Sequence, residues 1–511
     1  MTKLTLFCRA MQCVAVLCGL LQCWLDASVD NLVSVTLVVV SSYVLYEYFL
    51  RSGAIVDTPV SSLALIGFNT TACLVSLVAQ TLSAQGLVHL LRAPQETFAI
   101  LSGLLVMAVL VHAAYRNLAF FMSLRQWFAQ RVFEPVGALN EPPVWMIWTM
   151  AAIGAVSTFK GGAAYGDVGG KFVQALSFLQ WLPFVIPIYF KKHGRDYCDM
   201  KLQWPLLLSY VLLLAAIGLT RNARQLMLIG PFQAAVIYFL WTVQQKEAVG
   251  RWTTVKAGGL IVCMSLGVSL FSDLSTAMTI ARDQRETASR MEVVKETIAL
   301  LSEPEKLNQF RLRADLAAKV ALYDEAYLSN PVLSRLSETK FHDNMFFYAL
   351  SFNQRDGEDV WATTGEKLLT TLPQPFLDAM KLNIEKAKYG FSMGDYFRYL
   401  NEGEPVLGGY ATGSMWADML AVFGVWMPFV ACVLMVWLFL MFDSLSYGGD
   451  SFVISPIVLA STFVIFEYGL GADSLVTKIQ FILREWPQKI VLYLLIFHFL
   501  ALIFGKGRAP K

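Results

Sequence analysis

The sequence predicts an all-α, polytopic membrane protein that carries one large polar insert. Hydrophobic residues make up 56% of the 511 positions and charged residues only 15%, whereas a soluble domain carries roughly a quarter charged residues. Apolar stretches long enough to cross a hydrocarbon core, about 20 helical residues each, recur along most of the chain. The net charge of +2 and the lack of any basic run give no reason to expect a nucleic-acid partner.

Twelve apolar segments are candidate membrane-spanning helices. The first follows Lys3 and contains Arg9, as a secretion signal could, but we expect it to be retained because eleven further spans follow it. Nine segments precede the polar insert and three follow it. They are Leu4–Leu25, Leu32–Leu50, Pro59–Gln80, Glu96–Tyr115, Val144–Thr158, Phe172–Phe190, Trp204–Leu219, Gln225–Val243, Ala257–Leu274, Met415–Phe442, Phe452–Leu470 and Ile490–Phe504.

The polar insert, residues 276–412, is expected to form a largely helical domain. Charged and apolar residues alternate at helical spacing over Ala277–Leu301, and Ser302 with Glu305 forms a capping-box pattern that opens the next helix. Its aromatic and leucine content favours packing onto the membrane bundle. We therefore expect a bundle of nine spans (1–275), the helical domain (276–412), a bundle of three spans (413–505) and a short tail (506–511).

The distribution of positive charge predicts that both termini are cytoplasmic. If the amino terminus is cytoplasmic, the termini and short loops on that side hold sixteen Lys and Arg residues, and the opposite short loops hold eight. Cytoplasmic loops of membrane proteins carry such an excess of positive charge. The polar insert is then expected on the outer side of the membrane.

Several common catalytic and metal-binding patterns are missing from the sequence. It has no Walker loop, no GxSxG, no HExxH and no CxxC pair, and none of its eight cysteines falls in the polar insert. The first outer loop offers Asp26 and Asp30, but not the clustered carboxylates that hold the cation of a metal-dependent glycosyltransferase. We therefore expect no metal, no cofactor and no disulfide framework.

Arg221 and Arg224 lie in a tight outer turn between two spans. Three residues apart, they are expected to share one helical face. A guanidinium at the membrane edge is costly unless an anion pairs with it, and its planar fork fits a phosphate or diphosphate. Snorkelling towards lipid headgroups is the structural alternative, but two arginines on the side disfavoured for positive charge favour an anion clamp.

A second outer loop begins at Lys160-Gly161-Gly162 and ends at Gly169-Gly170-Lys171. Its glycines would let backbone N–H groups approach an anion, to which Lys160 and Lys171 would add charge. The spacing matches no phosphate-binding loop, so a flexible hairpin is the simpler explanation.

The polar insert contributes two candidate residues, Arg335 and His342. Arg335 would add a third fixed positive charge to the outer face. His342 is the only one of the five histidines that falls in the insert, and an imidazole near its ordinary pKa can accept a proton from a hydroxyl group. A purely structural histidine is the alternative.

The polar insert returns to the bundle through Gly408-Gly409-Tyr410-Ala411-Thr412-Gly413-Ser414-Met415-Trp416-Ala417-Asp418. Tyr410 is a candidate binding residue in this stretch. Asp418 opens an apolar span that otherwise lacks charge, and an acid there needs a partner or a role, for which the outer arginines are candidate partners. A carboxylate favoured by the dipole at a helix start is the structural alternative.

The whole chain resembles the bacterial oligosaccharide repeat-unit polymerases, which are the Wzy-type O-antigen and exopolysaccharide polymerases, and it is similar to their relatives, the O-antigen ligases. The likeness lies in about twelve spans, an arginine-bearing outer turn two spans before one dominant outer loop, and a few spans after that loop. Three stretches carry it locally: Thr220-Arg221-Asn222-Ala223-Arg224; Ser334-Arg335-Leu336-Ser337 with Leu372-Pro373-Gln374-Pro375 downstream; and Gly413-Ser414-Met415-Trp416-Ala417-Asp418 followed by Phe423-Gly424.

The chain departs from the family in two places. Gln374 stands where such enzymes tend to carry an arginine just after the first proline of the proline stretch. The ligases usually place a histidine where the large loop returns to the membrane, and this chain has Tyr410 and Asp418 there. The second departure favours polymerase over ligase and leaves the base undecided.

The resemblance implies a GT-C-like, metal-independent and inverting glycosyl transfer at the periplasmic face of the inner membrane. A sugar hydroxyl of one undecaprenyl-diphosphate-linked oligosaccharide would attack the anomeric carbon of the growing chain, and undecaprenyl diphosphate would leave. Arg221, Arg224 and Arg335 would stabilise the departing charge, and His342 or Asp418 would act as the base. The implied partners are the lipid-linked oligosaccharide, the bilayer, and a chain-length regulator and flippase of the same pathway.

Three other functions compete with a polymerase. An O-antigen ligase would use the same donor. A lipid-linked glycan transporter would also need many spans, although transporters tend to show related halves and broken helices near mid-membrane. A nonenzymatic scaffold for envelope assembly would not need paired outer arginines.

Overall fold

The computed structural model of the protein describes most of the 511 residues. The described residues are 2–160, 168–245, 271–282, 290–320, 323–328, 330–372, 374–382, 384–403, 407–447 and 453–505.

The structure is an all-α, multi-pass membrane protein. Within the described ranges, nine helices have at least 18 residues and are apolar enough to cross a membrane. They are Lys3–Leu25, Val29–Ser52, Pro59–Leu82, Pro94–Asn117, Gly169–Asp196, Met200–Thr220, Arg224–Gln244, Met415–Asp443 and Leu475–Phe504.

Five of these helices are single α-helices, and each of the others is assembled from shorter pieces. The single ones are α1 (Lys3–Leu25), α2 (Val29–Ser52), α6 (Pro94–Asn117), α11 (Met200–Thr220) and α12 (Arg224–Gln244). The assembled ones contain α4 (Pro59–Asn69), η1 (Thr70–Leu74) and α5 (Val75–Leu82); α9 (Val168–Ala175), η3 (Ser177–Val185), α10 (Ile186–His193) and η4 (Gly194–Asp196); α21 (Met415–Phe423), η6 (Gly424–Trp426) and α22 (Met427–Asp443); and α25 (Leu475–Gln480), η7 (Phe481–Glu485) and α26 (Trp486–Phe504).

Shorter elements complete the bundle. The amphipathic helix α7 buries none of its side chains in the protein, as expected for a helix that lies in a membrane interface. The only strands in the described part form a two-residue antiparallel pair. These elements are α3 (Ala54–Asp57), α7 (Ala119–Trp127), η2 (Phe128–Phe133), α8 (Val144–Lys160), β1 (Ser446–Tyr447), β2 (Val453–Ile454), α23 (Pro456–Leu459) and α24 (Thr462–Tyr468).

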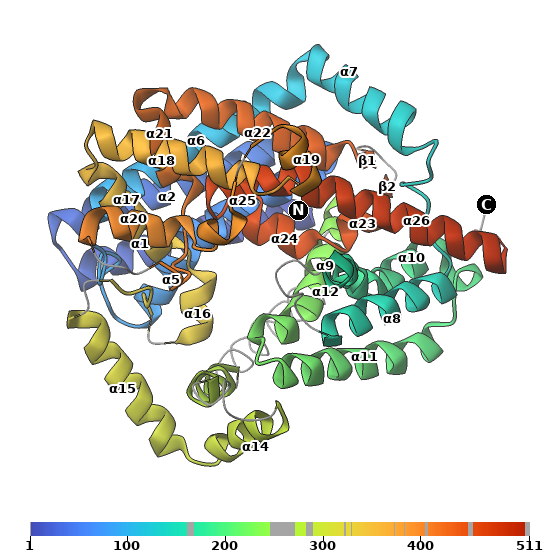
Figure 1. Ribbon diagram of the computed structural model, residues 1–511, viewed down its shortest axis with the longest axis horizontal. Coiled ribbons are helices and arrows are strands. Elements are labelled where there is room, and N and C mark those ends of the chain that lie inside the picture. Colours follow the sequence, from blue (N-terminus) through green and yellow to red (C-terminus); the bar gives the residue numbers. More distant parts are fainter. Residues whose placement is uncertain are drawn as a thin grey trace.

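The polar insert is helical, as its sequence predicts, and much of it packs against the bundle (Figure 1). Helices α17 and α18 contact α21, and α17 also contacts α6, whereas α14 and α15 extend at the lower left of the view. Its helices are α14 (Arg290–Leu301), α15 (Pro304–Val320), α16 (Pro331–Leu336), α17 (Thr339–Ser351), α18 (Gln354–Leu369), α19 (Gln374–Ala379), η5 (Lys386–Tyr389) and α20 (Met393–Glu402).

Nine of the twelve predicted spans correspond to the nine long helices. The Val144–Thr158 span corresponds to α8, which has 17 residues, and most of the Ala257–Leu274 span lies outside the described residues. The Phe452–Leu470 span is not one continuous helix: α23 ends at Leu459, and α24 begins at Thr462. The last span begins at Leu475, well before the predicted Ile490, because Ser474 caps α25 by accepting a hydrogen bond from the Thr477 N–H.

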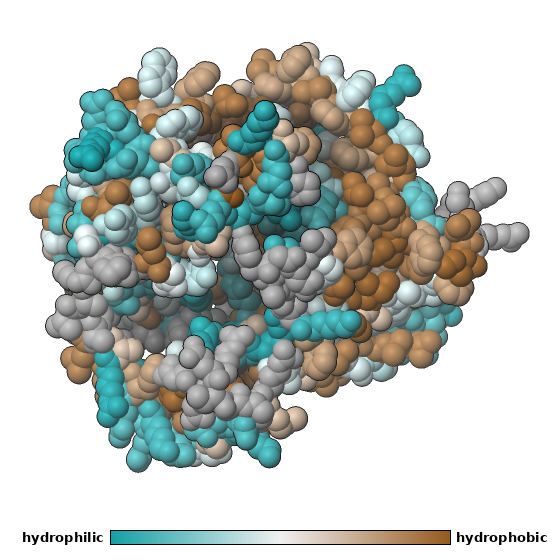
Figure 2. Space-filling view, viewed as in Figure 1, coloured by the Kyte–Doolittle hydropathy of each residue, from teal (hydrophilic) through white to brown (hydrophobic). Residues whose placement is uncertain are grey.

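The surface of the molecule agrees with a membrane bundle that carries a polar domain. In Figure 2, hydrophobic residues spread over the right half of the view, where Figure 1 places α8 and α26. Hydrophilic residues gather at the left and lower left, over helices of the polar insert. The apolar face has the character expected for contact with lipid.

Candidate functional site

A cavity with three arginines lies between the bundle and the polar insert. We call it the cationic cavity; its volume is about 370 Å³. Arg224 comes from the start of α12, Arg311 from α15 and Arg335 from α16. Glu325 is the only acidic residue among the described lining residues, so positive charge predominates. The lining residues are Arg224, Thr276, Thr279, Phe310, Arg311, Ala314, Glu325, Ala326, Leu328, Ser334, Arg335 and Phe341.

The turn before α12 places Arg224 in the cationic cavity. Helix α11 ends at Thr220, and Asn222 adopts a left-handed backbone conformation (φ 50°), which asparagine tolerates better than most residues. The Asn222 side chain donates a hydrogen bond to the Met278 carbonyl at 3.0 Å. The Arg224 guanidinium donates to Ser275 Oγ at 2.7 Å, so this turn is fastened to the helical residues 271–282.

Arg335 is more exposed than Arg311, the arginine that α15 contributes to the cavity. The Arg335 side chain is 54% exposed, and its Nη1 lies 3.6 Å from Glu325 Oε2. The guanidinium also lies over the Phe341 ring, 5.4 Å from its centroid. Arg311 is already paired with Asp273 at 2.6 Å. Arg335 and Arg224 are therefore the guanidinium groups of this cavity best placed to bind an anion.

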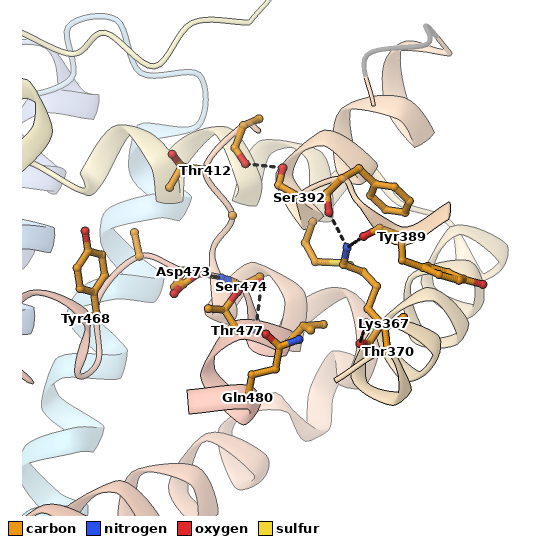
Figure 3. Close-up of a pocket in the computed structure, with 16 residues that line it drawn as sticks. Lys367, Thr370, Tyr389, Ser392, Thr412, Tyr468, Asp473, Ser474, Thr477 and Gln480 are labelled. Carbon is orange, nitrogen blue, oxygen red and sulfur yellow. Dashed lines mark hydrogen bonds between the residues drawn. The ribbon is translucent and has the colours of Figure 1, made fainter. Parts of the chain in front are cut away.

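A second cavity, which we call the polar cavity, has a volume of about 510 Å³ (Figure 3). Figure 3 shows Asp473, Ser474, Thr477 and Gln480 together on one side and Lys367, Tyr389 and Ser392 on the other. The lining residues are Lys367, Thr370, Tyr389, Phe391, Ser392, Met393, Ala411, Thr412, Gly413, Tyr468, Ala472, Asp473, Ser474, Val476, Thr477 and Gln480.

The two cavities share a wall. Thr412 lines the polar cavity, and its N–H donates to Oε1 of Glu325, which lines the cationic cavity, at 2.6 Å. Tyr468 also lines the polar cavity, and its hydroxyl accepts a hydrogen bond from Gln225, the neighbour of Arg224, at 3.3 Å. The two cavities are therefore immediate neighbours.

Two buried carboxylates hold the loop that carries Asp473, residues 470–474. Glu338 Oε2 accepts a hydrogen bond from the Ala472 N–H at 2.9 Å, and Asp418 Oδ2 accepts one from the Leu475 N–H at 2.7 Å. Gly471 is required in this loop, since a Cβ there would lie 2.2 Å from the Glu467 carbonyl oxygen and 2.4 Å from Glu338 Oε2. The position of Asp473 is thus set by neighbours on both sides.

The start of α17 is anchored inside the bundle at the π-helical turn η1. The Glu338 N–H donates to the Thr71 carbonyl, and Glu338 Oε2 accepts from the Thr71 hydroxyl at 2.7 Å. Thr339 Oγ1 donates to the Ala72 carbonyl at 2.7 Å. A π-helical turn is wider than an α-helical one and is found frequently at functional sites. Burial raises the pKa of Glu338 to about 7 despite these hydrogen bonds and the nearby Lys478 charge.

His342 lies one turn further along α17, fully buried and outside both cavities. Its Nδ1 is 2.7 Å from Ser414 Oγ, and its buried Nε2 has no hydrogen-bond partner. Burial lowers the pKa of His342 to about 3. Asp418 is also fully buried and lines neither cavity. The residues that the two predicted bases contact, Ser414 and Leu475, are sequence neighbours of the polar-cavity lining but do not line it themselves, so neither base faces a cavity.

The other predicted site residues lie on the surface or in the turn between α11 and α12. Arg221 follows the end of α11 and donates to the Thr158 carbonyl at 2.5 Å, so it does not share a helical face with Arg224. Lys160 and Lys171 are exposed and line neither cavity, and residues 161–167 between them lie outside the described residues. Tyr410 is 72% exposed and also lines neither cavity.

Sequence reasoning did not find Glu325, Glu338 or Asp473. Glu338 directly follows the arginine stretch Ser334–Ser337, and its position there was the available signal. Asp473 lies in Gly469-Leu470-Gly471-Ala472-Asp473-Ser474, where two glycines and an N-capping serine mark a break between helices.

Comparison of the chain with known proteins finds no matching family model, no matching curated protein and no matching solved structure.

Proposed function

We propose that this protein polymerises undecaprenyl-diphosphate-linked oligosaccharide repeat units into a cell-surface polysaccharide. The observation that carries the proposal is that Arg224 and Arg335, taken from two separate stretches that resemble the polymerases, line one cavity. Guanidinium groups bind phosphate oxygens through paired hydrogen bonds. The polar cavity beside them offers room for sugar residues.

In this proposal the protein is an inner-membrane glycosyltransferase with cytoplasmic termini and a periplasmic insert. The reaction is metal-independent and inverting: Arg224 and Arg335 stabilise the charge that develops as the diphosphate leaves the anomeric carbon. Arg221 supports the same turn from its contact with the Thr158 carbonyl.

Elongation by the purified, full-length protein tests this function. The substrate is the single lipid-linked repeat unit that a deletion strain accumulates, and the product length is read on a gel with and without a chelator. The Arg224→Ala, Arg335→Ala double variant is expected to lose at least 100-fold in rate, as removal of a charge-stabilising donor does in other enzymes. Arg355→Ala, an exposed arginine of the same insert outside both cavities, is the matched control. Full activity of the double variant would falsify the proposal.

A transporter for lipid-linked glycans is the second candidate, and one observation favours it. The segment α23–α24 is interrupted at Ala460 and Ser461, between two short helices within the bundle, and interrupted helices are common in transporters. The glycans of a deletion strain separate the candidates. Single-repeat surface glycan indicates a polymerase, unattached polymer indicates a ligase, and lipid-linked repeats retained in the cytoplasm indicate a transporter.

A further inference from the structure

The polar cavity differs in chemistry from the cationic cavity beside it. Its described lining includes hydroxyl and amide side chains, aromatic rings and one carboxylate, but no arginine. Hydroxyl and amide groups both donate and accept hydrogen bonds, which suits a ligand that carries several hydroxyls. The cavity therefore fits a sugar better than it fits a phosphate.

The wall opposite Asp473 is well ordered by internal hydrogen bonds. Lys367 Nζ donates to the carbonyls of Tyr389 and Phe391 at 2.8 and 2.5 Å, and it lies 4.3 Å from the centre of the Phe391 ring. Ser392 Oγ donates to the Ala411 carbonyl at 2.7 Å. Because the Lys367 charge is engaged with these carbonyls, this wall presents aromatic and hydroxyl groups to a ligand.

Asp473 is the only carboxylate among the described residues that line the polar cavity. Its Oδ1 accepts a hydrogen bond from the Ser474 N–H at 2.8 Å. Asp418 and Glu338, two other buried acids near this loop, each use one oxygen to hold its backbone and line neither cavity. Glu467, which is also buried beside the loop, lines neither cavity either. Geometry thus leaves Asp473 as the carboxylate available to a sugar in this cavity.

We infer that the polar cavity binds the acceptor sugar and that Asp473 is the general base that takes the proton from its attacking hydroxyl. This inference rests on the proposed function and assigns the base, which the sequence placed at His342 or Asp418. Burial raises the pKa of Asp473 above its ordinary value, with Lys478 acting in the opposite direction, which makes its carboxylate a stronger base. The titratable groups that act on Asp473 or feel its charge are Lys478, Glu485, Glu338, Asp418 and Tyr468.

The step balances with the groups present. The acceptor O–H proton moves to an Asp473 oxygen while the hydroxyl oxygen forms a bond to the anomeric carbon of the donor. The bond between that carbon and the diphosphate oxygen breaks, and its electron pair leaves with the diphosphate. In this inference the charge develops beside Arg224 and Arg335, which line the cationic cavity on the other side of the Thr412–Glu325 contact.

Asp473→Asn tests the inference because asparagine keeps the size and the Oδ1 acceptor but cannot take the proton. In the full-length protein, with the lipid-linked repeat from the deletion strain, kcat is expected to fall about 10²–10⁴-fold, the range usual for loss of a general base. KM for the repeat should change only a few-fold. The low-pH fall in kcat, which reports protonation of the base, should also disappear. Glu385→Gln, an exposed acid of the insert outside the cavities, is the control.

The outcomes separate this inference from the proposed function. If Asp473→Asn keeps more than a third of kcat or retains the low-pH fall, Asp473 is not the base. If it does so while the Arg224→Ala, Arg335→Ala variant is inactive, the polymerase proposal stands and only the inference is lost. Should Asp473→Asn melt like the parent protein and lose kcat as expected, reduced folding does not explain the loss.

Discussion

Two groups of buried polar side chains in the bundle differ in how completely they are paired. The first, which we call the closed network, joins four segments: Ser61 Oγ donates to Asp443 Oδ2 at 2.5 Å and lies 2.7 Å from His112 Nε2, and the Tyr48 hydroxyl lies 2.9 Å from His112 Nδ1. No side-chain N or O atom of these four residues is both buried and unpartnered.

The second group, the open network, is Glu338, His342 and Asp418. It holds the loop 470–474 and the start of α21, but His342 Nε2 and Asp418 Oδ1 remain buried without a partner. Buried polar atoms without partners are uncommon in native proteins and need a reason. The open network borders the polar cavity through Ala472, whose N–H donates to Glu338, whereas no residue of the closed network lines either cavity.

The comparison indicates that an ionisable residue within a bundle can be accounted for by its hydrogen-bond partners alone. A histidine and an aspartate in spans are functional candidates by default, yet the closed network explains both by mutual hydrogen bonding. Buried polar atoms that lack hydrogen-bond partners beside a cavity distinguish candidate functional residues from structural ones better than charge does. The open network has such atoms.

Among substitutions in the two networks, the largest effect is expected for Glu338→Ala. The substitution removes the acceptor for the Thr71 hydroxyl and the Ala472 N–H, so the loop that carries Asp473 loses its position. Elongation should fall at least 100-fold and the melting temperature should also fall. Glu338→Gln keeps an acceptor oxygen, so it should retain most of the elongation rate and most of the melting temperature of the parent protein. Unchanged elongation by Glu338→Ala would show that the open network does not support the site.

Asp443→Ala should instead affect stability alone. It removes the acceptor for the Ser61 N–H and one of the two partners of the Ser61 hydroxyl, and leaving one buried donor unpaired costs about 1–3 kcal/mol. The melting temperature in detergent is expected to fall, while the elongation rate per folded molecule stays within twofold. A specific loss of rate in folded protein would mean that the closed network also serves the reaction.

The stability of the protein should depend on pH through Glu338. Its pKa is about 7 in the folded protein and 4.5 ordinarily, so the folded state binds more protons between those values. Stability therefore falls as pH rises from about 4.5 to 7, at most by about 1.4 kcal/mol per pH unit. Melting temperatures measured across this range should show the fall in the parent protein and a smaller fall in Glu338→Gln. If the melting temperature falls equally steeply with pH in both proteins, Glu338 is not the group that causes the fall.

Within the open network, His342→Asn should have the smallest effect, less than tenfold on elongation. The asparagine side chain can replace the Nδ1 contact with Ser414, and His342 lines neither cavity. Rates of the variant and its parent at saturating lipid-linked repeat measure the difference. A loss of 100-fold or more with an unchanged melting temperature would restore His342 as the base.

Much of the fold follows from the sequence because long apolar runs must become helices in a membrane, whatever their neighbours. The segment 452–470 is the instructive failure. Its composition is that of a span, but helix continuity also depends on local contacts, and α23 and α24 are separate helices. Since Asp473 follows this segment, treating it as one continuous helix also left the carboxylate of the polar cavity unnoticed.

The candidate site was predictable only where chemistry is local. Arginines at Arg224 and Arg335 attract notice by charge and spacing alone, and the structure places both in one cavity. Burial cannot be read from the sequence in this way. We expected His342 and Asp418 to be accessible, but the packing of α17 against α21 buries both. Tertiary contacts decide which acid or base can meet a ligand.

The anchoring of α17 at η1 has a consequence for biogenesis. Thr71 and Ala72 take up partners that are synthesised 267 residues later in the chain. The contacts of this early hydrophobic helix are therefore completed only after the ribosome has passed Thr339, and truncation anywhere before Glu338 should leave that helix a target for membrane quality control.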